Sequence, residues 1–314
     1  MVFLEAVQGV LSIIFMISTG YFLSHKGWFD DKSSKLLSKL VVSLSLPAYM
    51  ISNLVSNYSK DELLQLDSGL VIPFASMILC YLIAVAASKL IKIPDGRKGT
   101  FCSMFALSNT IFVGLPVNLA LFGDISIPYV LLYYIANTTL FWTVGVYGIS
   151  RDAGNSGGKV LTGSNIKRIF SPPLTGFLLA IVLILLEIHL PKSILDTCKY
   201  LGNLTTPLSM LFIGIIIHSV NLKEIKVDKG MVVLLAGRFI VAPLLVFAMT
   251  FMIPMPLLMK KVFVIQAAMP AMTQTSIIAE NYNADYKYAA VMTAVTTMAS
   301  LISIPLYMAL LSLL

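Results

Sequence analysis

The chain has 314 residues, of which 58% are hydrophobic and only 12% charged, and its mean hydropathy is +0.89. Soluble globular proteins carry about 25% charged residues and roughly 45–50% apolar ones. This composition excludes a disordered chain, a collagen or a secreted disulfide scaffold, and it predicts a protein that crosses a membrane several times. The net charge of +7 is spread over short loops between apolar runs, so it does not indicate nucleic-acid binding.

Apolar runs follow one another along the whole chain. A helix needs roughly 20 apolar residues to cross about 30 Å of hydrocarbon. The runs are continuous and do not alternate with a period of two, which excludes outer-membrane strands. The first run lacks a basic leader and a cleavage site, so we expect it to be retained. The sequence predicts an all-α membrane protein with ten transmembrane helices, at residues 4–24, 34–56, 68–90, 99–122, 127–150, 169–189, 197–220, 231–252, 259–280 and 286–313.

The positions of lysine and arginine orient these predicted spans. The loops that follow the odd-numbered spans, with the adjoining span ends, hold 16 of these bases, whereas those after the even-numbered spans hold 5. Short loops rich in Lys and Arg stay in the cytoplasm. We therefore expect both termini to be extracytoplasmic, in a multi-pass protein of the plasma membrane.

A Gly/Ser-rich polar segment, 151–168, divides the chain into residues 1–150 and 169–314, each with five predicted spans. Five is an odd number, so two such units enter the membrane in opposite orientations, as in the inverted repeats of many transporters. Three pairs of prolines in corresponding spans support a duplication: Pro47 and Pro207, Pro73 and Pro243, and Pro116 and Pro270.

Spans 4 and 9 carry the strongest signal for a binding site. In span 4, Ser108-Asn109-Thr110 precedes Gly114-Leu115-Pro116, and in span 9 Pro270 is followed by the polar run 273–276. A proline inside a helix removes a donor and frees carbonyl groups, which lipid cannot satisfy. A single break of this kind would be explained by a kinked helix that packs within the bundle. Two breaks at corresponding positions favour a site near the midplane, where half-helix N-termini attract a carboxylate.

The run Ser108-Asn109-Thr110-Ile111-Phe112-Val113-Gly114-Leu115-Pro116 resembles the span-4 motif of the auxin efflux carrier family, which includes plant auxin exporters and bacterial organic-acid permeases. The segment Gln266–Pro270, followed by residues 279–283, resembles its span-9 region, whereas Ala271-Met272-Thr273 departs from the plant pattern. The resemblance implies an inverted repeat with broken crossover helices 4 and 9, as in bile-acid symporters and sodium–proton antiporters. It also implies a homodimer, an elevator-like motion of spans 3–5 and 8–10 against spans 1, 2, 6 and 7, and organic anions as substrates.

Other polar residues within the spans have alternative interpretations. Asn137 and Thr138 either line the site or pack between helices. Arg238 either balances the charge of a dicarboxylate or caps a carbonyl. We attribute Trp142 and Tyr134 to interface anchoring or packing. The expected crossover prolines are Pro116 and Pro270, and the expected substrate-binding residues are Asn109, Thr110, Gly114, Asn137, Thr138, Thr273, Gln274 and Arg238.

These patterns predict a secondary transporter or uniporter for small organic anions, with malate or a related dicarboxylate as its substrate. The alternatives are a sodium-coupled carrier of the bile-acid-symporter type and an exporter of auxin-like weak acids. No acidic residue lies near the middle of a predicted span, which argues against a dedicated cation site. A membrane enzyme is disfavoured because no catalytic cluster shares one depth, and a channel lacks a ring of charges. We expect no metal and no cofactor, and the expected partners are the substrate, membrane lipid and a second copy of the chain.

Overall fold

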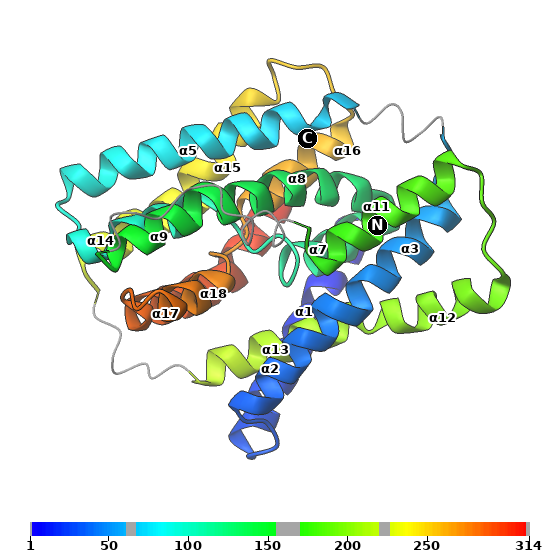
Figure 1. The fold of residues 1–314 in the computed structure, drawn as a ribbon, viewed down its shortest axis with the longest axis horizontal. Coiled ribbons are helices and arrows are strands. Elements are labelled where there is room, and N and C mark those ends of the chain that lie inside the picture. The colour runs from blue at the N-terminus through cyan, green and yellow to red at the C-terminus, as the bar shows by residue number, and fades with distance from the viewer. Residues whose placement is uncertain (1, 61–66, 155–169, 220–226, 312–314) are drawn as a thin grey trace.

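The computed structural model describes residues 2–60, 67–154, 170–219 and 227–311, and these are almost entirely helical (Figure 1). Most of the predicted connector 151–168 lies outside the described residues. The helices are α1 (Val2–His25), α2 (Asp31–Leu40), α3 (Leu46–Asn57), α5 (Val71–Leu90), α6 (Lys98–Ala106), α7 (Gly114–Phe122), α8 (Ile127–Leu140), α9 (Val146–Asp152), α11 (Pro172–Leu185), α12 (Lys192–Asn203), α13 (Thr205–Ser219), α14 (Lys229–Ala236), α15 (Ala242–Met249), α16 (Leu257–Ala267), α17 (Gln274–Asn281) and α18 (Tyr286–Leu311).

Six helical stretches in the described part of the chain are long and apolar enough to cross a membrane. They are Lys32–Asn57, Val71–Leu90, Asp124–Asp152, Lys192–Ser219, Lys229–Met249 and Tyr286–Leu311. Leu11–His25 and Pro172–Leu185 are shorter apolar helices. The all-helical class is therefore confirmed, whereas the count of ten spans and the orientation of the termini stay predictions.

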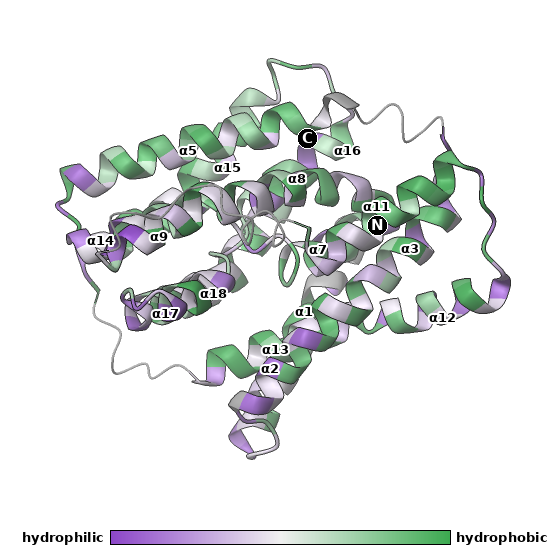
Figure 2. Cartoon of the chain, viewed as in Figure 1, coloured by the Kyte–Doolittle hydropathy of each residue, from purple (hydrophilic) through white to green (hydrophobic). Residues whose placement is uncertain are grey.

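Apolar side chains cover much of the outer surface of the helices. Figure 2 shows long hydrophobic stretches on α5, α8 and α15. Ile302 is 77% exposed and Phe15 is 66% exposed, although both would be buried in a soluble protein of this size. Contiguous exposed apolar surface on this scale fits contact with lipid acyl chains.

The prolines of the predicted spans have different local effects. Pro47 and Pro243 each follow a π-helical turn, at Val41–Ser45 and Gly237–Val241, and the helix continues through it. The wider turn accommodates the carbonyl group that a proline ring would otherwise meet. A third π-helical turn, Phe141–Gly145, joins α8 to α9 without a proline. Among the described residues of the predicted ranges, only 99–122 and 259–280 are interrupted by long non-helical segments.

The helices pack in two groups, which are visible in Figure 1. In the first group, α1 packs along α13, and α3 packs against α11 and α12. In the second group, α5 packs against α6, α8 and α15, and α17 packs against α18. Helix α7 contacts both groups, through α1 and α13 on one side and through α8 and α16 on the other. Helix α7, the second half of one broken helix, therefore lies where the two groups meet.

Candidate functional site

Two extended segments cross between the halves of the broken helices. Residues 107–113 connect α6 to α7, and residues 268–273 connect α16 to α17. They meet as an isolated antiparallel bridge between Ser108 and Ala271, and the Asn109 backbone N–H donates to Pro270 O at 2.8 Å. The crossing thus satisfies backbone groups that helical hydrogen bonds have left free, as a membrane interior requires.

Proline and glycine explain why helical structure stops here. Pro270 lies inside the second extended segment, and Pro116 is the third residue of α7. A proline in the first turn lacks only an N–H that has no helical partner, but its ring excludes helical structure immediately upstream. Gly114 opens α7, and a methyl group at this position would overlap the side-chain amide of Gln266. That amide donates to Thr110 O at 3.3 Å, which joins α16 to the first crossing segment.

Side chains from the following helices hold each extended segment. Asn137 of α8 accepts from the Ser108 backbone N–H and donates to the Ser108 carbonyl, both at 2.9 Å. In the second crossing, the Ala271 backbone N–H donates to Thr296 Oγ1 of α18 at 3.2 Å. In each half of the chain, a side chain from the last predicted span therefore forms a hydrogen bond with the backbone of the crossing segment.

The ends of α6 and α16 are also capped by side chains. Cys80 of α5 lies with its Sγ 3.9 Å from Phe105 O, and Arg238 donates from a terminal guanidinium nitrogen to Ala267 O at 2.7 Å. Arg238 is fully buried, and its Nε and second terminal nitrogen have no hydrogen-bond partner among the described residues. A cation at the end of α16 is stabilised by the partial negative charge of a helix C-terminus.

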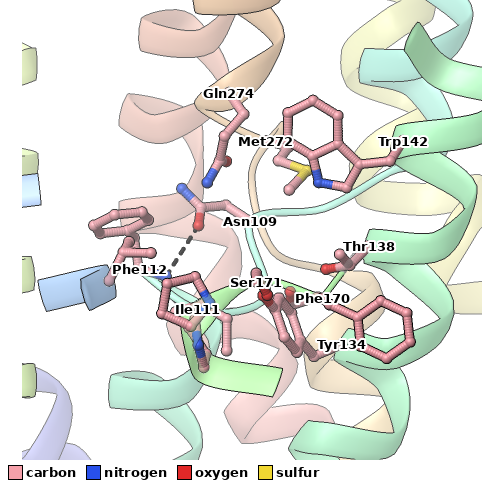
Figure 3. Close-up of a pocket in the computed structure, with 14 residues that line it drawn as sticks. Asn109, Ile111, Phe112, Tyr134, Thr138, Trp142, Phe170, Ser171, Met272 and Gln274 are labelled. Carbon is pink, nitrogen blue, oxygen red and sulfur yellow. Dashed lines mark hydrogen bonds between the residues drawn. The ribbon is translucent and has the colours of Figure 1, made fainter. Parts of the chain in front are cut away.

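A cavity of about 370 Å³ lies beside the crossing (Figure 3). This volume is within the usual range of small-molecule sites. No Asp, Glu, Lys, Arg or His is among the described residues that line it. Those residues are Val42, Asn109, Thr110, Ile111, Phe112, Tyr134, Thr138, Trp142, Phe170, Ser171, Pro172, Pro173, Met272 and Gln274.

Three polar side chains of the cavity wall keep unused hydrogen-bonding atoms. Asn109 Oδ1 accepts from the Phe112 backbone N–H at 3.1 Å, while Asn109 Nδ2 has no partner among the described residues. Thr110 Oγ1 and Thr138 Oγ1 are likewise buried and unpaired there. Figure 3 shows the amide group of Gln274 turned toward Asn109. A buried donor without a partner is costly, so this wall suits a ligand that accepts hydrogen bonds.

The helix ends add positive potential to the same cavity. Helix α7 begins at Gly114, directly after the lining residues 109–112, and α17 begins at the lining residue Gln274. A helix N-terminus carries about +0.5 of an elementary charge. Two such ends and the free Asn109 amide together favour an anionic group, although no side chain of the described wall is charged.

The structure brings four of the expected substrate-binding residues to the cavity wall: Asn109, Thr110, Thr138 and Gln274. The other four lie close by or elsewhere. Thr273 adjoins Gln274, and its Oγ1 lies 3.5 Å from Gln274 Oε1. Gly114 packs under Gln266, Asn137 holds Ser108, and Arg238 caps α16.

Sequence reasoning missed several residues of the wall. Tyr134 and Trp142, assigned to anchoring or packing, line the cavity, and the Tyr134 hydroxyl lies 2.6 Å from Ser171 Oγ. Tyr134, Thr138 and Trp142 are spaced by four residues, so their common helix face was a signal in the sequence. No comparable signal marked the segment 170–173, which closes the wall from the first helix group.

Broken helices that cross beside a cavity with several polar residues in its wall, in a chain with several helices able to span a membrane, are typical of membrane transporters. Residues 5–308 match the family model described as "Membrane transport protein", so the chain belongs to this family and the resemblance to auxin efflux carriers is confirmed. It is 26% identical over 308 residues to an uncharacterized transporter of Methanocaldococcus jannaschii, covering 95% of this chain and 96% of that one. It is 24% identical over 312 residues to an uncharacterized transporter of Methanothermobacter thermautotrophicus, covering 98% and 99%. These findings support a transporter rather than an enzyme.

Proposed function

We propose that this transporter carries small organic anions, with malate or a related dicarboxylate as the substrate, and that a carboxylate binds in the cavity beside the crossing. The unpaired Nδ2 of Asn109 is the observation that carries this proposal. It is a buried donor next to two helix N-termini, which is the arrangement that a carboxylate oxygen completes. Thr110, Thr138 and Gln274 would contact the rest of the substrate.

The cavity wall also favours a second candidate, a weak acid with one carboxylate and an aromatic ring. Phe112, Tyr134, Trp142 and Phe170 supply four aromatic side chains, and no cation faces them from the described residues. Aromatic rings pack well on one another, and a single carboxylate needs no second counter-charge. A dicarboxylate would place its second charge near hydroxyl and amide groups alone, so the two candidates differ in a measurable way.

We propose alternating access of the elevator type. The helices derived from spans 3–5 and 8–10 would move as one body against those from spans 1, 2, 6 and 7. The separate packing of the two helix groups supports this division, and α7 touches both groups. The matched contacts of Asn137 on Ser108 and of Thr296 on Ala271 support two inverted repeats, 1–150 and 169–314. A homodimer in the plasma membrane, with extracytoplasmic termini, completes this proposal.

Uptake of radiolabelled malate into proteoliposomes tests the proposal directly. The membrane potential, the proton gradient and the sodium gradient are set independently, and indole-3-acetate is measured on the same vesicles. Saturable malate uptake that follows the potential without sodium supports the dicarboxylate carrier. Uptake of the aromatic acid alone selects the second candidate, and a requirement for sodium selects the sodium-coupled alternative. Folded protein that transports none of the organic anions would refute the substrate class.

A further inference from the structure

Two of the three histidines of the chain meet at one end of the molecule, far along the sequence from each other. His25 lies in the last turn of α1, and His218 lies in the last turn of α13. Their ring centroids are 5.9 Å apart, with the rings inclined at 69°. Tyr21 packs edge-on against His218 at 5.2 Å. His25 is exposed and His218 is partly buried, so an ion can reach the pair from solvent.

We propose that His25 and His218 form a binding site for a divalent transition-metal ion such as Zn²⁺, with water filling the other coordination positions. Imidazole nitrogen binds zinc at about 2.0–2.1 Å, so two imidazoles on one tetrahedral ion have centroids about 5–6 Å apart. The observed centroid spacing of 5.9 Å lies within this range. No cluster of three His, Cys, Asp or Glu occurs in the described part of the chain, which makes this a two-residue site.

The helices hold the two imidazoles at this spacing. Helix α1 packs along α13 over its length. A methyl group at Gly20 would overlap Leu211 O, and one at Gly214 would overlap Ile17 O, so the two backbones are in direct contact. Neither helix can slide without opening this contact. A pair of ligands on a rigid support loses little conformational entropy when it binds an ion.

The two helix C-termini at this place favour a cation, whereas Lys26, which directly follows His25, opposes one. Helices α1 and α13 both end here, at His25 and Ser219, and each C-terminus carries a partial negative charge. The nearby Lys26 ammonium lies over the Phe22 ring, 5.4 Å from its centroid. Two convergent helix ends are an observation independent of the ring spacing, and both point to the same ligand.

Calorimetric titration of the detergent-purified full chain with ZnCl₂, after removal of any histidine tag, tests the site. The third histidine, His189, is exposed in the loop between α11 and α12 and gives a control. We expect about one ion per chain for the wild type and for His189→Gln, and at least tenfold weaker binding for His25→Gln and for His218→Gln. Binding by the wild type should also raise the Tm.

Two results would overturn the site: no saturable zinc binding by the wild type, or His25→Gln binding as tightly as the wild type. His25 is exposed, so its substitution leaves the packing intact and decides the question even if His218→Gln does not fold. Because the measurement reports binding and not uptake, its outcome is independent of the proposed organic-anion transport.

Discussion

Replacement of Asn109 separates its two hydrogen-bonding roles. Its Oδ1 accepts from the Phe112 backbone N–H, which shapes the crossing segment, whereas its Nδ2 is buried in the cavity wall without a partner among the described residues. Asn109→Ala removes both groups. Asn109→Asp keeps the acceptor and replaces the donor with a second carboxylate oxygen, so it preserves the local structure and opposes an anion.

The expected size of the effect follows from the donor. A hydrogen bond to a charged group contributes about 1.5–3 kcal/mol, and 1.4 kcal/mol corresponds to a factor of ten in affinity. We therefore expect Asn109→Ala to raise the KM for the transported anion by about 10- to 150-fold. Asn109→Asp should abolish saturable uptake at neutral pH, because two anionic groups would share a buried site.

Proteoliposome uptake at graded substrate concentrations measures KM, and Asn203→Ala is the control because Asn203 is an exposed asparagine at the end of α12. The Tm and the elution profile of each variant establish that it is folded. A KM for folded Asn109→Ala within threefold of the wild type would refute a substrate contact at this amide.

Three further substitutions test the supports of the site. Asn137→Leu leaves the Ser108 N–H unpaired, at about 1–3 kcal/mol, and removes one of the two donors to the Ser108 C=O, so its Tm and its uptake should fall together; a normal Tm would contradict a supporting role for Asn137. Gly114→Ala should lower the free energy of unfolding by about 1–3 kcal/mol, because the added methyl group overlaps Gln266, and the Tm should fall accordingly. An unchanged Tm would contradict this close contact. Arg238→Gln should reduce uptake of malate and of a monocarboxylate by the same factor, since the guanidinium caps Ala267 O; a selective loss of malate uptake would instead return Arg238 to the substrate site.

The helix breaks were predictable because they are local. Pro270 and the Gly114-Leu115-Pro116 run each disfavour continuous helix through their own backbone chemistry. The convergence of Asn109 with Gln274 also followed from the sequence, since polar residues beside a break in lipid must face protein or a cavity. The same logic could not separate the π-helical turns before Pro47 and Pro243 from true breaks, because that difference depends on how neighbouring helices pack.

The partners of single polar residues could not be predicted, because they depend on the register between distant helices. Asn137 and Ser108 are 29 residues apart, and so are Arg238 and Ala267. Composition shows only that each polar group needs a partner in the membrane. Tertiary packing decides whether that partner is a substrate or a backbone group. Here the side chains of Asn137 and Arg238 each form a hydrogen bond with the backbone of a broken helix.

The position of Arg238 outside the cavity wall suits a carrier that must release its substrate. In a low-dielectric site a guanidinium–carboxylate pair is strong and holds its ligand tightly. Here the only arginine inside a predicted span, Arg238, caps the C-terminus of α16, and the cavity offers neutral donors and two helix N-termini. Those N-termini belong to α7 and α17, so the positive potential for an anion is built into the crossing itself. An anion bound there would travel with the crossing helices and leave without breaking an ion pair.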